Sequence, residues 1–159
     1  MKSTLVAALA GLALALPALL QPLAARAADT PFMGKWALDV ANSTMKDPKP
    51  KSVEVLVTVD AKNRVAWTET SVDSKGKTHK EKYDLPTNGK LMQGPEKNWK
   101  IAATRVDDHT LKFHSVSTKG DVEDQTCTAD GVSTVTCEGT YTAAGKTTPV
   151  KEVYTKQTS

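Results

Sequence analysis

The sequence predicts an all-β protein, an antiparallel up-and-down β-barrel of about 8–10 strands. From Lys51 onward, short segments rich in Val and Thr alternate with turns that contain Gly, Asn or Asp. No stretch after Ala28 shows the 3.6-residue apolar period or the length of a crossover helix, which disfavours a parallel sheet. A closed meander is favoured over a sandwich because closure removes both sheet edges.

The strands are predicted from period-two patterns between these turns. Val53, Val55, Val57 and Val59 would share one face of the clearest strand. The same criteria predict strands at residues 34–40, 64–72, 78–84, 90–92, 99–105, 110–118, 122–129, 134–142 and 150–156. The last is predicted to begin after Pro149, because proline cannot donate a hydrogen bond to a ladder.

The first 27 residues have the pattern of a secretory signal peptide. Lys2 precedes an apolar run at residues 5–20, and Ala25 and Ala27 match the small-residue cleavage pattern. The run is shorter than a bilayer span, so we expect cleavage after Ala27 and no stable membrane insertion. The predicted organisation is a signal peptide at 1–27 and one β-barrel domain at 28–159, located in the periplasm or secreted.

The charge balance gives little reason to expect a nucleic-acid partner. Removing Lys2 and Arg26 with the signal peptide lowers the formal net charge of the 159-residue chain from +3 to +1. The remaining lysines are interleaved with acids, and no row of stacking aromatics accompanies them, so we interpret them as a solvated outer face.

Cys127 and Cys137 are the only two cysteines, and export would place them in an oxidising compartment. They flank the Asp130-Gly131 turn, so a hairpin would set them opposite each other on neighbouring strands. We therefore predict a structural disulfide between them rather than a redox-active pair, since Cys-x-x-Cys spacing is absent.

The segment Phe32-Met33-Gly34-Lys35-Trp36-Ala37-Leu38-Asp39, followed by Ala41-Asn42-Ser43, resembles the Gly-x-Trp opening of lipocalins. It is similar to the start of exported bacterial lipocalin-like, calycin-type proteins. The resemblance implies structural roles for Gly34 and Trp36, with Trp36 at the closed end of the barrel. It also implies a long first loop at residues 43–50 over the open end, and Arg105 is a candidate for the arginine at the closed end.

The sequence contains no complete catalytic or metal-binding signature. His79, His109 and His114 lack zinc-site spacing, and Asp107-Asp108-His109 fits an ordinary turn between strands. No Gly-x-Ser-x-Gly elbow is present. We therefore expect no catalytic residue, metal or cofactor, although a Ser-His-Asp arrangement formed by folding stays an open alternative.

Four residues are candidates for a ligand site inside the barrel. Trp67 is in phase with Val65 and Glu69, which places an apolar wall beside a carboxylate. Eight aromatic residues are few for filling such a barrel, which indicates a cavity. We predict that Trp67, Phe113 and Tyr141 form the wall and that Glu69 makes a polar contact. The competing interpretation is a barrel filled by its own side chains, with Glu69 at the rim.

The predicted function is the binding of a small apolar or amphipathic molecule without chemical change. One alternative is an exported interaction or inhibitor protein that contacts a protein partner through its loops. The other is a small calycin-type barrel enzyme, which a buried carboxylate or His with a shifted pKa in the lumen would distinguish.

Overall fold

The computed structural model describes residues 30–158, so the predicted signal peptide at 1–27 lies outside the described residues. Ten strands are present in this part of the chain. They are β1 Gly34–Leu38, β2 Ser52–Ala61, β3 Arg64–Val72, β4 Thr78–Pro86, β5 Met92–Gln93, β6 Trp99–Asp107, β7 Thr110–Ser117, β8 Val122–Ala129, β9 Thr134–Ala143 and β10 Lys146–Lys156. In this range no helix is long and apolar enough to span a membrane.

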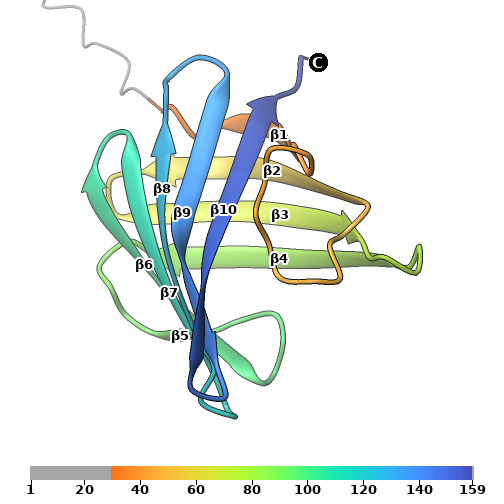
Figure 1. The fold of residues 1–159 in the computed structure, drawn as a ribbon. Helices are drawn as coiled ribbons and strands as arrows, with labels where there is room; N and C mark the ends of the chain where they lie inside the picture. The colour runs from red at the N-terminus through yellow and green to blue at the C-terminus, as the bar shows by residue number, and fades with distance from the viewer. Residues whose placement is uncertain (1–29, 159) are drawn as a thin grey trace, which may run out of the picture.

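All ten strands belong to one antiparallel sheet in the order β4-β3-β2-β1-β10-β9-β8-β7-β6-β5. Every strand pairs with its chain neighbour except β4 with β5, and the two ends of the chain meet where β1 pairs with β10. In Figure 1, β2, β3 and β4 run across the direction of β6 to β10, so the sheet curves around an interior. The predicted all-β up-and-down barrel is confirmed.

The segment after β4 nearly closes the barrel by reaching β6. Arg105 N donates to Thr87 O at 3.2 Å, and Gly89 N donates to Ala103 O at 2.8 Å. Asn88 also forms an isolated bridge with Thr104. These bonds give partners to residues 103 and 105 on the outer edge of β6.

The strand predicted at residues 90–92 is observed later, as β5 at Met92–Gln93. The register explains the shift. Asn88 lies opposite Thr104, and Met92 lies opposite Ile101. The segment from Asn88 to Met92 therefore contains one residue more than the stretch of β6 that it faces. Residues 90–91 therefore loop outward, and Leu91 is exposed.

The prediction that the last strand begins after Pro149 is wrong, because β10 begins at Lys146 and Pro149 pairs with Thr140. Lys151 N and O both bond to Thr44, on the side away from β9. By the period of two, the nitrogen of Pro149 points to that same side. Strand β1 pairs only with residues 154–156 of β10, so no ladder bond is lost at Pro149.

The four valines of β2 do not all share one face. A register shift between Val57 and Val59 inserts an extra residue into the strand. Beyond this bulge the alternation is reversed, so Asp60 becomes buried opposite Val65. The bulge therefore turns the carboxylate of Asp60 toward the interior of the barrel.

Cys127 and Cys137 form a disulfide and lie directly opposite each other on β8 and β9, as predicted. The turn between them is organised by Asp130, whose Oδ1 accepts the backbone N–H groups of Val132, Ser133 and Thr134 at 2.8 to 2.9 Å. These hydrogen bonds hold the pKa of Asp130 well below its usual range. The turn thus sets the register that brings the two sulfurs together.

Candidate ligand-binding site

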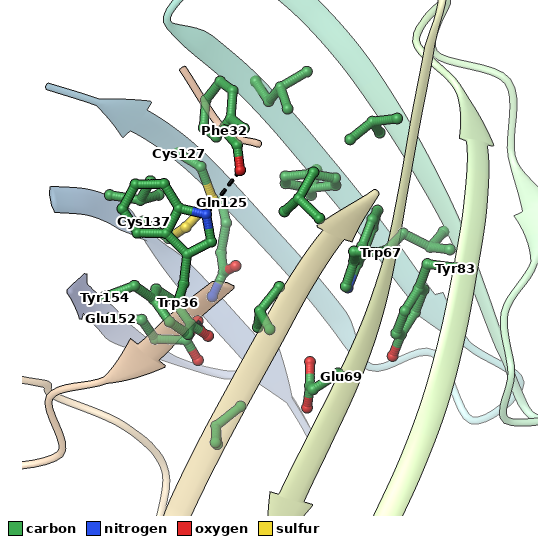
Figure 2. Close-up of a pocket in the computed structure, with 18 of the residues that line it drawn as sticks. Phe32, Trp36, Trp67, Glu69, Tyr83, Gln125, Cys127, Cys137, Glu152 and Tyr154 are labelled. Carbon is green, nitrogen blue, oxygen red and sulfur yellow. Dashed lines mark hydrogen bonds between the residues drawn. A yellow bond between two sulfur atoms is a disulfide. The ribbon is translucent and has the colours of Figure 1, made fainter. Parts of the chain in front are cut away.

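A partly open cavity of about 430 Å³ lies inside the barrel. This volume is within the range of small-molecule sites. The lining residues come from β1, β2, β3, β4 and β6 to β10 and from the segments before β1 and β2. Its lining is mainly apolar and aromatic, with a few polar side chains. In Figure 2, Trp67 and Tyr83 lie on one side of this space, and Gln125, Glu152 and Tyr154 lie on the other.

The closed end of the barrel is built around a buried ion pair. Arg105 forms a hydrogen-bonded salt bridge with Asp60, and their side chains are only 9% and 1% exposed. The second carboxylate oxygen of Asp60 accepts the Phe32 N–H at 3.1 Å, and Trp36 Nε1 donates to Phe32 O at 2.7 Å. Trp36 is 2% exposed, and its hydrogen bond attaches the buried indole to the segment before β1.

The loop of residues 39–51 lies at the opposite end of the strands. Met45 and Pro50 from this loop line the cavity. Ser43 holds the loop in place, because its hydroxyl donates to Asp39 O at 2.7 Å and accepts the Val153 N–H at 3.0 Å. The loop therefore contributes part of the rim of the candidate site.

Three aromatic rings form a continuous wall. The rings of Trp67 and Tyr83 are stacked, with centroids 4.4 Å apart and an interplanar angle of 9°. Phe113 meets Trp67 edge-on at 5.5 Å. The cross-strand register causes the stack, since Trp67 of β3 is directly opposite Tyr83 of β4.

Three glutamates also face the cavity: Glu69 of β3, Glu123 of β8 and Glu152 of β10. Burial raises the pKa of Glu69 to about 7, and repulsion from Glu152, Glu81 and Glu123 adds to the effect. Burial likewise raises the pKa of Glu123 to about 7, assisted by Glu152 and Asp124. Burial also raises the pKa of Glu152, against hydrogen bonds from Tyr154 and Gln125 that lower it.

These pKa values link stability to pH. An unfolded glutamate releases its proton near 4.5, whereas folded Glu69 and Glu123 release theirs near 7. Between those pH values the folded chain binds protons that the unfolded chain has released. The contribution of these groups to stability therefore falls as the pH rises from 4.5 to 7. Ionisation of these buried glutamates near neutral pH therefore lowers the stability of the folded protein.

Of the four predicted ligand contacts, Trp67, Glu69 and Phe113 line the cavity and Tyr141 does not. Tyr141 lies opposite Glu123, and its ring and hydroxyl contact Lys46 of the rim loop. Tyr141 thus contacts the rim loop and does not line the cavity.

Four important lining residues were not predicted: Tyr83, Glu123, Glu152 and Tyr154. A signal for Glu123 was present, because it is in phase with Cys127, whose disulfide fixes the inward face of β8. Residues 152 and 154 are similarly in phase with buried Val150 on β10. Nothing in the sequence showed that these strands would face β3 across one cavity.

The predicted structural residues lie at the start of β1. Gly34 has a φ of 113°, a conformation that residues with a Cβ rarely adopt. Two residues later, the ring of Trp36 lies 5.1 Å from Lys156 Nζ. Gly34 thus lies at the first residue of β1, two residues before the buried Trp36.

Solved structures with a similar fold are β-barrels. One is a redesigned β-barrel, with a TM-score of 0.51, 11% identity, and coverage of 82% of this chain and 96% of that chain. Another is a point mutant of the fluorescent protein UnaG, with a TM-score of 0.56, 11% identity, and coverage of 81% and 98%. The likeness to these structures is one of fold alone, an antiparallel β-barrel.

The siderocalin Ex-FABP, described as functioning through dual ligand specificities, is a weaker match, with a TM-score of 0.41, 15% identity, and coverage of 80% of this chain and 71% of that chain. No family model matches the sequence, and a search of curated proteins gives no match. At such low identities the similarity establishes the architecture and leaves the ligand open.

The three histidines of the barrel occupy separate sites. His79 pairs with Asp73, His114 pairs with Asp124, and His109 Nδ1 lies 3.2 Å from Ala129 O. Asp107 accepts the His109 backbone N–H at 2.8 Å, which makes residues 107–109 a turn. Within residues 30–158, no group of three or more His, Cys, Asp or Glu is arranged to hold a metal ion.

Proposed function

We propose that this protein is an exported lipocalin-like binding protein that holds a small, partly apolar molecule in its barrel without changing it chemically. The observation that carries the proposal is the cavity of about 430 Å³ with its aromatic wall and few polar groups. Enclosing roughly 200 Å² of apolar ligand surface contributes roughly 5 kcal/mol before entropic costs, at about 25 cal/mol per Å². Micromolar to millimolar dissociation constants are therefore expected.

Native mass spectrometry of protein purified from its own host tests this function directly. A retained small molecule would add a defined mass to the folded protein, and denaturation would release it. Failure of fatty acids, isoprenoids and aromatic compounds to bind, together with a lumen filled by side chains, would contradict the proposal. That result would favour the alternative in which the loops contact a protein partner.

Trp67→Ala should weaken binding of any ligand that the panel identifies by about 5- to 30-fold, because the apolar contact with the indole is lost. Calorimetry is the measurement, since the substitution removes a fluorescent reporter. Trp99→Ala is the matched control, because Trp99 is outside the cavity lining. An equal loss of affinity in both variants would contradict binding beside Trp67.

Export is supported by the disulfide, which indicates a non-cytoplasmic environment. We propose that residues 1–27 direct the chain to the periplasm or the outside of the cell and that the mature domain begins at Ala28. Intact-mass measurement of protein from its own host should give the mass of residues 28–159 less two hydrogens. A mass that includes residues 1–27 would contradict cleavage.

One observation favours the alternative of a small barrel enzyme. The pKa of about 7 at Glu69 and Glu123 is the value that general acid–base catalysis at neutral pH requires. The lining serines, Ser71 and Ser115, have no hydrogen bond to a base in the described part of the chain, and burial among carboxylates accounts for the pKa values. Recovery of the bound molecule with altered mass, dependent on Glu69, would support catalysis instead of binding.

A further inference from the structure

The charge of the cavity lining is entirely negative. Glu69, Glu123 and Glu152 are the ionisable carboxylates among the lining residues, and the described lining contains no Lys, Arg or His. The ion pairs formed by Lys35, Arg64 and Lys151 are exposed and lie outside the lining. Arg105, whose side chain is buried, is already paired with Asp60.

Two exposed lysines are engaged by aromatic side chains. Lys46 contacts the ring and hydroxyl of Tyr141 at the rim, and Lys156 lies over the ring of Trp36. Tyr83 and Tyr154 face the cavity as neutral phenols, because burial raises the pKa of each. In the part of the chain that the structure describes, the cavity lining thus contains no positive charge to balance the glutamates.

The three carboxylates differ in their hydrogen bonds. Glu123 Oε1 accepts Gln125 Nε2 at 3.1 Å, and Glu152 Oε2 accepts the Tyr154 hydroxyl at 3.0 Å. Glu69 lines the cavity but has neither a hydrogen bond nor an ion pair in the described part of the chain. Burial is the main cause of its raised pKa. A buried carboxylate without a donor is costly, and a ligand that supplies a donor or a positive charge removes that cost.

The aromatic wall suits the same kind of ligand. Glu69 lies two residues from Trp67 on the inward face of β3, beside the stack of Trp67 and Tyr83. Aromatic ring faces attract cations, and the attraction is greater away from water. A positive group between Glu69 and these rings would be stabilised by both, while an apolar body would fill the rest of the cavity.

We propose that the ligand of this cavity is an amphipathic organic cation, in which a protonated amine or a quaternary ammonium group lies among Glu69, Glu123 and Glu152. The inference rests on the proposed binding function and specifies its ligand class. An anionic amphiphile, such as a fatty acid carboxylate, is disfavoured because it would add a fourth negative charge to the cavity.

A matched decyl series tests the charge preference: decylamine, decyltrimethylammonium, decanol and decanoate, each titrated by calorimetry below its micelle concentration. At about pH 8 Glu69 and Glu123 are mostly ionised, and both cations should bind about tenfold more tightly than decanol. Decanoate should bind more weakly than decanol. At about pH 5.5 Glu69 and Glu123 are protonated, so the advantage of the cations should fall to less than about threefold.

Glu69→Gln should reduce the preference for decylamine over decanol by about fivefold at about pH 8, while the affinity for decanol stays the same. Glu138→Gln is the matched control, because Glu138 lies on the outer face of β9 and is exposed. It should leave the preference unchanged. Near-UV circular dichroism would establish that both variants keep the native packing.

The outcomes separate this inference from the proposed function. Binding of decanol with no preference for the cations, or tighter binding of decanoate, would overturn the cationic ligand and leave the binding function standing. An equal effect of Glu69→Gln and Glu138→Gln would also overturn it. Absence of binding by all four compounds and by the wider ligand panel would reject the binding function and this inference together.

Discussion

Asp60→Ala should lower the free energy of unfolding by about 3–5 kcal/mol, because it leaves the buried guanidinium of Arg105 without its counter-charge. The side chains of Asp60 and Arg105 are 1% and 9% exposed, so water cannot take the place of the lost carboxylate. The substitution also removes the acceptor of the Phe32 N–H. Urea unfolding of the purified protein, monitored by circular dichroism, measures the change.

Asp84→Ala is the matched control for this experiment. It breaks another Asp–Arg pair, formed with Arg64, in which both side chains are more than half exposed. That loss should leave stability almost unchanged, because water and screening compensate for an exposed ion pair. The double variant Asp60→Ala/Arg105→Met should lose less stability than the two single variants combined. Equal effects of Asp60→Ala and Asp84→Ala would show that the closed end does not depend on its ion pair.

Trp36→Ala should destabilise the fold by about 3–5 kcal/mol, because truncating a buried indole removes its packing and leaves a void. Trp36 is 2% exposed, and its Nε1–H bond to Phe32 O would be lost as well. The deletion would also enlarge the cavity, since Trp36 is part of its lining. Denaturant melts measure the change in stability.

Leu56→Ala on neighbouring β2 provides the comparison, because Leu56 faces outward and is 47% exposed. Its effect should stay within about 0.5 kcal/mol, as is usual for surface substitutions. A change below about 1 kcal/mol for Trp36→Ala would contradict the structural role assigned to this residue.

The local properties of the chain could be read from the sequence because they depend on neighbouring residues. Hairpin turns and period-two alternation are short-range, so the number, direction and approximate bounds of most strands were predictable. The pairing of Cys127 with Cys137 was predictable for the same reason, since one short turn joins their strands. Trp67 and Glu69 could be assigned to one inward face from a single strand.

The charge of the site and the closure of the barrel depended on the tertiary structure. The bulge after Val57 turned Asp60 inward, toward an arginine 45 residues away, and simple alternation predicted the opposite face. Glu69, Glu123 and Glu152 come from three strands that are not adjacent in the sheet. Only the curvature of the sheet gathers them around one cavity. Burial there raises the pKa of all three, and repulsion from neighbouring carboxylates adds to the effect at Glu69 and Glu123. In the sequence each of them is an ordinary glutamate on a strand. Its altered pKa could not be predicted, because desolvation and repulsion depend on neighbours that only folding brings together.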